Sequence, residues 1–255
     1  MRNIGIICKR ELASFYTTWI AYSLLARFAF VFGYMFVVAV AIFVTRSMES
    51  QMMGQSFPMN VNEWVIAPLF MNISVLSLFL IPMIGMRLFA EEKSTGTIEL
   101  LLTSPVRDTE IVLGKWLGGL VCYAAIVGVS GLLVLILFAF GNPDLKPVLA
   151  GYGGLILQGG CLMAICAFLS SITRNQIIAA DAGFTICLLL WVLDWPSAYS
   201  SGRWVEVLSF LSLSRHLEPF TRGIINSKDF FYYAAMVFFF LFLTKRSVES
   251  TRWRA

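Results

Sequence analysis

The sequence predicts an all-α membrane protein with six transmembrane helices, and two observations carry this prediction. Hydrophobic residues make up 58% of the chain and charged residues only 13%, whereas a soluble domain carries about 25% charged residues. Apolar runs longer than about 18 residues, long enough to cross a bilayer as a helix, recur along the chain. The mean hydropathy of +0.79 agrees with both. The chain is therefore expected to form a single transmembrane domain over residues 1–255.

The charge and cysteine patterns argue against other classes of protein. The net charge is +4, but the basic residues lie between apolar runs and form no patch interleaved with aromatic side chains, so no nucleic acid is expected as a partner. The cysteines form no Cys-x-x-Cys pair, so neither a metal site nor a disulfide is expected. The first residues lack the short apolar core and cleavage site of a removable signal peptide.

The N-terminal third is predicted to contain an interfacial helix and two spans. Residues 1–18 mix isoleucine and phenylalanine with basic residues, a pattern typical of a helix lying along the membrane surface. The first span is expected from Trp19 to Val44, and the polar residues 46–60 are expected to form an exposed loop. The second span is expected from Val65 to Met86.

Two polar segments divide the remaining four spans. Residues 87–115 form the longest cytoplasmic segment, and residues 194–229 are expected to be extracytoplasmic, in part as a re-entrant pair of half-helices buried in protein. The last span is short, so it is expected to extend into its flanking basic residues. The four spans are expected at Trp116–Phe140, Val148–Ser170, Ile177–Leu193 and Phe230–Thr244.

The basic residues near the span ends set the expected orientation. With the N-terminus inside, twelve of them fall on the inner side and six on the outer side, which is the asymmetry of the positive-inside rule. Both termini are therefore expected in the cytoplasm, with the chain as a multi-pass protein of a bacterial cytoplasmic (inner) membrane.

Residues 90–106, between the second and third spans, carry the most specific functional signal. Glu91 and Glu92 can pair with basic groups of a partner, and Gly96 permits a sharp start for a short apolar helix. In that helix, Ile98 and Leu101 together with Leu102 can fill a groove of the partner. An ordinary solvated loop with acidic ends is the alternative that composition alone leaves open.

The stretch from Glu91 to Val106 resembles the ABC-2 type transporter permease family. The resemblance rests on the order Glu-Glu-Lys, then Gly-Thr, then Ile-Glu-Leu-Leu-Leu-Thr-Ser-Pro-Val. The resemblance is to the branch with the gliding-motility permeases and the nitrous-oxide-reductase maturation permease. Together with the six-span layout it covers most of the chain. A second pattern of this branch lies before the last span, at His216, Phe220, Gly223, Ile224, Ile225 and Asp229.

This resemblance implies the transmembrane permease subunit of an ATP-binding cassette exporter. The segment after the second span would be a coupling helix seated in a cytoplasmic ABC ATPase subunit, present in two copies. A second permease copy or a homologous permease would complete the dimer, and the lipid bilayer and a periplasmic accessory protein would be further partners. The expected ATPase-contacting residues are Glu91, Glu92, Lys93, Gly96, Thr97, Ile98, Glu99, Leu101 and Leu102.

ATP hydrolysis is expected on the partner subunit, so the chain itself is not expected to be an enzyme or to bind a cofactor. It contains no GxxxxGK phosphate loop, because Gly114-Lys115 lacks a glycine five residues before Gly114. ATP and Mg²⁺ would therefore bind to the ATPase. The substrate is not specified by the sequence.

Two ionisable residues within predicted spans are candidates for the translocation path. Arg27 lies about two turns into the first span, where its side chain could instead extend to the inner interface. Asp181 lies one turn into the fifth span, and a path role and a buried ion pair are both open for it. The main alternative function is an ion-driven secondary transporter or channel, which would need intramembrane acidic clusters and broken helices.

Two further patterns are assigned to packing. The glycines of Gly114–Gly118 and Gly154–Gly160 are expected to allow close helix contacts, mainly within one subunit. His216 has no second ligand nearby in sequence, so we expect it to cap the outer face instead of binding a metal.

Overall fold

The computed structural model describes residues 2–52, 60–97, 106–141, 143–198 and 202–252. Every regular element in these ranges is a helix, so the predicted all-α class is confirmed. The elements are α1 (Arg2–Thr17), α2 (Trp19–Met52), η1 (Asn62–Ile66), α3 (Ala67–Gly85), α4 (Arg87–Thr95), α6 (Asp108–Phe140), α7 (Leu145–Ile172), α8 (Gln176–Val192), η2 (Trp195–Ala198), α9 (Arg203–Phe210), α10 (Leu213–Thr221) and α11 (Ser227–Arg252).

Within the described ranges, five helical segments are long and apolar enough to cross a membrane. The predicted fifth span corresponds to α8, but this helix has only 17 residues, or about 25 Å of length against about 30 Å of hydrocarbon. Six full-length spans are therefore not confirmed. The five segments are Ala21–Ser50, Asn62–Thr95, Asp108–Phe140, Leu145–Ile172 and Ser227–Ser250.

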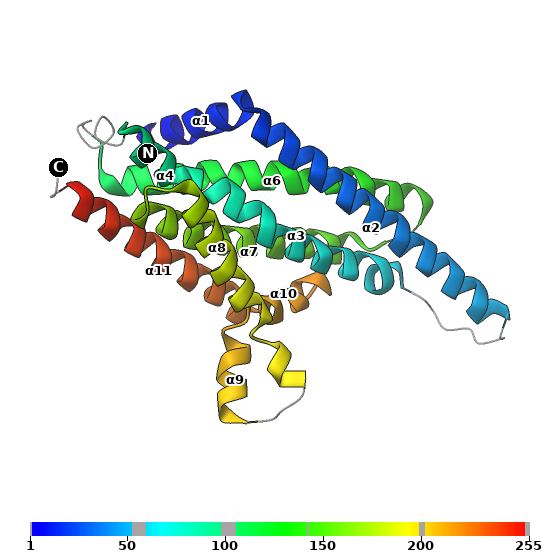
Figure 1. Ribbon diagram of the computed structural model, residues 1–255. Coiled ribbons are helices and arrows are strands. Elements are labelled where there is room, and N and C mark those ends of the chain that lie inside the picture. The colour runs from blue at the N-terminus through cyan, green and yellow to red at the C-terminus, as the bar shows by residue number, and fades with distance from the viewer. Residues whose placement is uncertain (1, 53–59, 98–105, 142, 199–201, 253–255) are drawn as a thin grey trace.

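The helix α2 continues past the predicted end of the first span. It extends to Met52, so the predicted loop over residues 46–60 is helical in its first part. The prediction was wrong because it ended the helix where the apolar run ends, although residues 46–52 contain no glycine or proline. The 34 residues of α2 give a length of about 51 Å, and Figure 1 shows its far end extending beyond the neighbouring helices.

The helix α7 is the most deeply buried of the spans and contacts α3, α6, α8, α10 and α11. Glycines on its surface allow aromatic rings from neighbouring helices to approach its backbone. A Cβ atom at Gly151 would lie 2.2 Å from Phe70 Cε2, and one at Gly159 would lie 2.2 Å from Tyr123 Cε1. Gly154 is covered by Phe220 in the same way, so these glycines pack within the chain, as predicted.

Buried hydrogen bonds also connect the spans. The hydroxyl oxygens of Tyr123 on α6 and Ser77 on α3 lie 2.8 Å apart, and Gln158 Nε2 on α7 donates to Ser74 Oγ on α3 at 2.7 Å. All four side chains are buried. Because interhelical hydrogen bonds in membranes contribute about 0.6 kcal/mol each on average, these bonds add specificity to contacts that are mainly made by packing.

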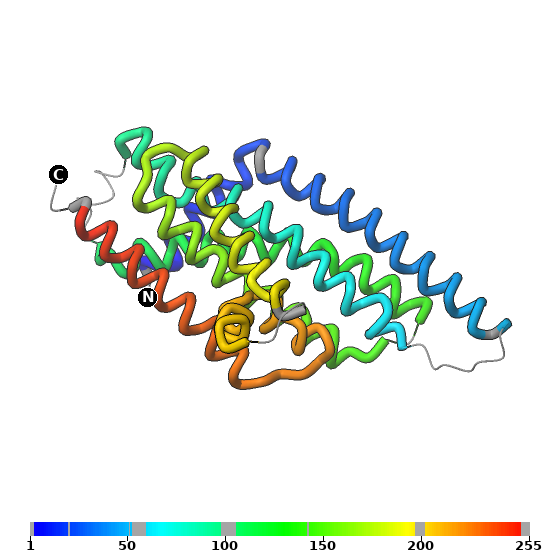
Figure 2. Tube along the Cα trace, turned by 60° about the horizontal axis from the view of Figure 1, so that its bottom comes forward, coloured from blue at the N-terminus to red at the C-terminus, as the bar shows by residue number. Residues whose placement is uncertain are grey.

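The two ends of the bundle are built differently. Figures 1 and 2 place α1 and the C-terminal end of α11 at the same end. Near the start of α11, α10 packs against α3, α7 and α8, whereas α9 projects away from the bundle (Figure 1). Residues 194–229 thus contain one helix that packs against the bundle and one helix that is largely exposed, and the re-entrant pair expected for this segment stays a prediction.

The contact between Gly159 and Tyr123 gives a test of the packing around α7. We expect Gly159→Ala to lower the free energy of unfolding by about 1–3 kcal/mol, because the added methyl group overpacks a buried site. Gly153→Ala on the same helix is the control, since no atom lies within 4 Å of its Cβ position. Denaturation of the purified protein in detergent measures both. Equal stability of the two variants would contradict the close contact.

Candidate functional site at the junction of α1, α4 and α6

A buried lysine joins two helices to the start of α6. Lys115 Nζ lies 2.7 Å from Glu11 Oε1 on α1 and 2.9 Å from Glu92 Oε1 on α4. Only 1% of the Lys115 side chain is exposed, and its Nζ also lies 5.4 Å from the centroid of the Phe89 ring. Because a buried ammonium group is costly without a counter-charge, the position of Lys115 requires both α1 and α4 to stay close to α6.

Glycines on α6 bring α1 close enough for this contact. A Cβ atom at Gly114 would lie 2.8 Å from Ile7 Cβ, and one at Gly118 would lie 2.8 Å from Glu11 Cβ. The four-residue spacing of these glycines puts both on one face of the helix, so α1 lies directly on the α6 backbone. Burial raises the pKa of the neighbouring Cys8 thiol, and the charge of Glu11 raises it further, so Cys8 adds no charge here.

Two arginines complete the charge balance. Arg10 Nη2 donates to Glu92 Oε1 at 2.9 Å and lies 3.6 Å from Glu11 Oε1. Arg87 forms two hydrogen bonds to Glu91, with Nε donating at 2.8 Å and Nη2 at 3.1 Å. We call the set Arg10, Glu11, Arg87, Glu91, Glu92 and Lys115 the ionic junction. It contains three cations and three carboxylates.

The ionic junction lines a cavity of 610 Å³ between α1, α4 and α6. The formal charges around the cavity cancel, so it offers no net attraction to a phosphate or another simple anion. Two buried polar atoms in the junction, Arg87 Nη1 and Glu92 Oε2, make no hydrogen bond to any described residue. The cavity therefore has the chemistry of a polar protein contact more than that of an anion site.

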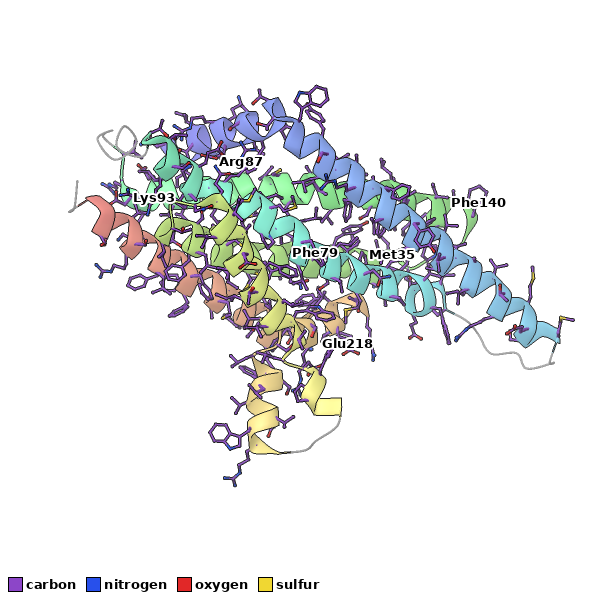
Figure 3. The ribbon with its side chains drawn as sticks, viewed as in Figure 1. Met35, Phe79, Arg87, Lys93, Phe140 and Glu218 are labelled. Atoms are coloured by element: carbon purple, nitrogen blue, oxygen red, sulfur yellow. The ribbon has the colours of Figure 1, made fainter. Side chains whose placement is uncertain are left out.

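The helix α4 is also fixed to the end of α7. Two N–H groups of its first turn, on Phe89 and Ala90, donate to Ser170 Oγ at 3.0 and 2.9 Å. Such N–H groups have no partner within their own helix and need an acceptor from elsewhere. Further along α4, Lys93 Nζ donates to the Ser171 carbonyl oxygen. Figure 3 shows Arg87 and Lys93 at the end of the bundle where α1 lies, far from Glu218 on α10.

Gly96 ends α4, and the short helix that the sequence predicts after it lies outside the described residues. It is the C-terminal capping residue, and its φ of 73° lies in the left-handed region that favours glycine. The side chains of Ser94 and Thr95 just before it, and of Thr97 just after it, are exposed. The other predicted contact residues, Ile98, Glu99, Leu101 and Leu102, lie outside the described residues.

Sequence reasoning missed the centre of the junction. It considered Lys115 when excluding a phosphate loop and did not single out Glu11, although the structure pairs these two residues 104 positions apart. The available signal was the Gly-Lys-Trp-Leu-Gly pattern at 114–118, in which a lysine lies beside a close-packing glycine face. A charge next to such a face must be buried with a partner or extend away from it.

The two candidate path residues are not brought together. Arg27 on α2 and Asp181 on α8 are both exposed on the surface of the single chain. The buried ion pair that the sequence left open for Asp181 is therefore not formed within the described part of this subunit.

Five helical segments of the described residues that are long and apolar enough to cross a membrane, packed into one bundle, define an integral membrane protein of the helical-bundle class. The family model described as ABC-2 family transporter protein matches residues 7–243, so the chain belongs to this family. Membership makes it the membrane subunit of an ABC transporter, and such permeases generally work with a cytoplasmic ABC ATPase. A comparison with curated proteins gave no match.

The burial of Lys115 predicts a large effect of its removal. We expect Lys115→Met to lower the free energy of unfolding by about 3–5 kcal/mol, because it leaves two largely buried carboxylates short of a counter-charge. Combining it with Glu11→Gln and Glu92→Gln should recover much of this loss. Lys245→Met is the control, since Lys245 is 36% exposed in its pair with Glu249 and such pairs contribute about 0–1 kcal/mol. Denaturation in detergent compares the variants, and a Lys115→Met protein as stable as the control would refute the buried junction.

Proposed function

We propose that this chain is the permease subunit of an ABC-2 exporter in which α4 receives movement from the ATPase and the ionic junction carries it to the spans. The observation that supports this most is the pairing of Lys115, in the span-forming helix α6, with Glu92 of α4. It connects the segment with the family's coupling pattern directly to a transmembrane helix.

The contacts of α4 suggest a division of roles among the predicted contact residues. Glu92 and Lys93 hold α4 inside the subunit through Lys115 and Ser171. The exposed tip, Ser94–Thr97, is free to meet the ATPase. In the proposed arrangement the apolar side chains of Ile98, Leu101 and Leu102 fill a groove of the ATPase.

Buried pairing makes movement of α4 relative to α6 costly. Separating Glu92 from Lys115 would remove one of the two carboxylates that balance this buried lysine, and incomplete pairing of a buried charge is costly. In the proposed mechanism α1, α4 and α6 therefore move together when the ATPase displaces the tip of α4. Coupling through packed and ion-paired elements of this kind needs no contact between the ATPase and the spans themselves.

The assembly that we propose is a dimer of permeases, identical or homologous, with two ATPase copies that bind ATP and Mg²⁺. In it α8 serves as a short sixth span, and both termini face the cytoplasm of a bacterial cell from its cytoplasmic membrane. The patterns at Glu91–Val106 and His216–Asp229 support the gliding-motility and nitrous-oxide-reductase-maturation branch. Hydrolysis belongs to the ATPase, so the chain is not itself an enzyme.

The exposure of Arg27 and Asp181 supports a place for them inside this dimer. A charge on a lipid-facing surface costs about 2.5–3.5 kcal/mol at the centre of a span. Contact with a second permease or with a water-filled path between two permeases would remove much of this cost. Both residues therefore remain candidates for the translocation path.

The first experiment is to purify the protein in mild detergent from its native membrane and identify stoichiometric partners. We expect a subunit with a phosphate loop. Thr97→Arg should reduce its recovery about tenfold or more, equivalent to about 1.4 kcal/mol of binding, because it places a bulky charge on the exposed tip. Recovery of no ATPase under several gentle conditions would favour the ion-driven transporter.

A second variant separates docking from transmission. We expect the pair Lys115→Leu and Glu92→Leu to keep the ATPase bound, while the ATP-dependent change in hydrogen exchange along α6 and α7 is lost. Lys245→Met should leave both unchanged. An unaltered ATP-dependent change in the double variant would contradict transmission through the ionic junction, and loss of the ATPase would contradict the division of roles within α4.

A further inference from the structure

A histidine and an aspartate form a buried pair at the end of α11 that lies away from the ionic junction. His216 on α10 is 2% exposed, and Asp229 in the first turn of α11 is 5% exposed. His216 Nδ1 lies 2.6 Å from Asp229 Oδ1, and its Nε2 lies 2.8 Å from the carbonyl oxygen of Phe210, the last residue of α9. One imidazole ring thus connects three helices.

The number of protons in this pair follows from its partners. A carbonyl oxygen only accepts hydrogen bonds, so Nε2 must carry a hydrogen and donate it to Phe210. In a neutral imidazole Nδ1 would then be bare, and it would face the carboxylate of Asp229 with two lone pairs only 2.6 Å apart. The observed contact therefore requires one additional proton, either on Nδ1 or on Asp229 Oδ1.

Neighbouring groups hold the ring and the carboxylate in place. The Tyr232 ring stacks on His216 with centroids 3.9 Å apart, and its hydroxyl donates to the Leu211 carbonyl oxygen at 2.7 Å. Asn226 Nδ2 donates to the second carboxylate oxygen of Asp229 at 3.2 Å. The carboxylate is therefore fixed toward His216 and cannot turn away without losing this bond.

The other charged side chains of α9, of α10 with its C-terminal cap and of the first turn of α11 are exposed, namely Arg203, Glu206, Arg215, Glu218, Arg222 and Lys228. Lys228 Nζ lies 5.6 Å from the Phe210 ring centroid, and Arg215 donates to Ser209 Oγ. The titratable neighbours of Tyr233 on α11 include Asp229, Tyr123 of α6 and Cys161 of α7. The helix α3 contains no titratable residue, and the titratable residues of α8 are Asp181, which is exposed, and Cys187, which faces Cys166.

We propose that His216 and Asp229 bind one shared proton that fixes α9 and α10 to the start of α11. When the proton is released to water, the two facing acceptors repel each other and this contact opens. His216 is thus a positioning residue that acts through Asp229 and the Phe210 carbonyl, and the segment that it positions becomes sensitive to pH. The proposal goes beyond the exporter assignment and does not depend on it.

The sign of the pH dependence follows from this count. The shared proton is present at lower pH and lost as the pH rises, so the contribution of the pair to folding is also lost as the pH rises. Asp229→Asn replaces the shared proton with a permanent amide hydrogen, which can donate to Nδ1 of a neutral imidazole. This variant should keep both ring contacts and lose the pH dependence.

The chain contains a single histidine, so its imidazole can be observed directly. The test uses the full-length protein in lipid nanodiscs, labelled with ¹⁵N-histidine, with hydrogen exchange of residues 203–221 followed over the same pH series. We expect both ring nitrogens of the wild-type protein to carry or share hydrogen, and exchange in this segment to rise at the pH where that hydrogen is lost. In Asp229→Asn, exchange should stay low across the series.

Three results would overturn the proposal. The first is a bare Nδ1 in a wild-type protein whose segment remains protected. The second is a rise in exchange that does not coincide with the imidazole titration. The third is an Asp229→Asn protein that follows the wild-type pH dependence. Glu218→Gln is the matched control on α10, since Glu218 pairs with the exposed Arg222, and it should leave the wild-type curve unchanged.

Discussion

The burial of one charge, on Lys115, constrains the arrangement of three helices. An ammonium group with 1% exposure is tolerated only when carboxylates surround it, and these come from α1 and α4. The glycines of α6 make the approach of α1 sterically feasible, while Ser170 and Ser171 of α7 accept hydrogen bonds from α4. The end of the bundle that contains α1 is thus specified by electrostatics, whereas α7 within the spans is specified by packing.

The two ends of the bundle compensate their buried ionisable side chains in different ways. At the ionic junction, three basic side chains face three glutamates, so formal charges of opposite sign balance each other. At the start of α11, an imidazole facing both a carboxylate and a carbonyl oxygen needs one specific proton count. Buried permanent pairs favour rigidity, and a buried histidine pair favours a contact that can open.

The sequence was sufficient for features that follow from local composition. Long apolar runs located the five segments that are long enough to cross a membrane, and the glycines of α7 indicated close contacts within the chain. Contacts between distant positions could not be predicted from local patterns. No periodicity in the sequence indicates that Lys115 pairs with Glu11 or that His216 pairs with Asp229. The end of α2 was also predicted wrongly. The end of an apolar run indicates where a helix leaves the membrane, but the helix itself can continue through polar residues, as α2 does to Met52.

The joint between α1 and α2 gives the long second helix a mechanical property. Only Thr18 separates the two helices, and its hydroxyl donates to the Ser14 carbonyl oxygen while its own carbonyl accepts from Ala21. The joint is therefore hydrogen-bonded on both sides. If α1 and α2 tilted together by about 5°, the far end of a helix about 51 Å long would move by about 4 Å. A small tilt shared by the two helices would thus become a displacement of several ångströms at the end of α2 that extends beyond its neighbours α3 and α6.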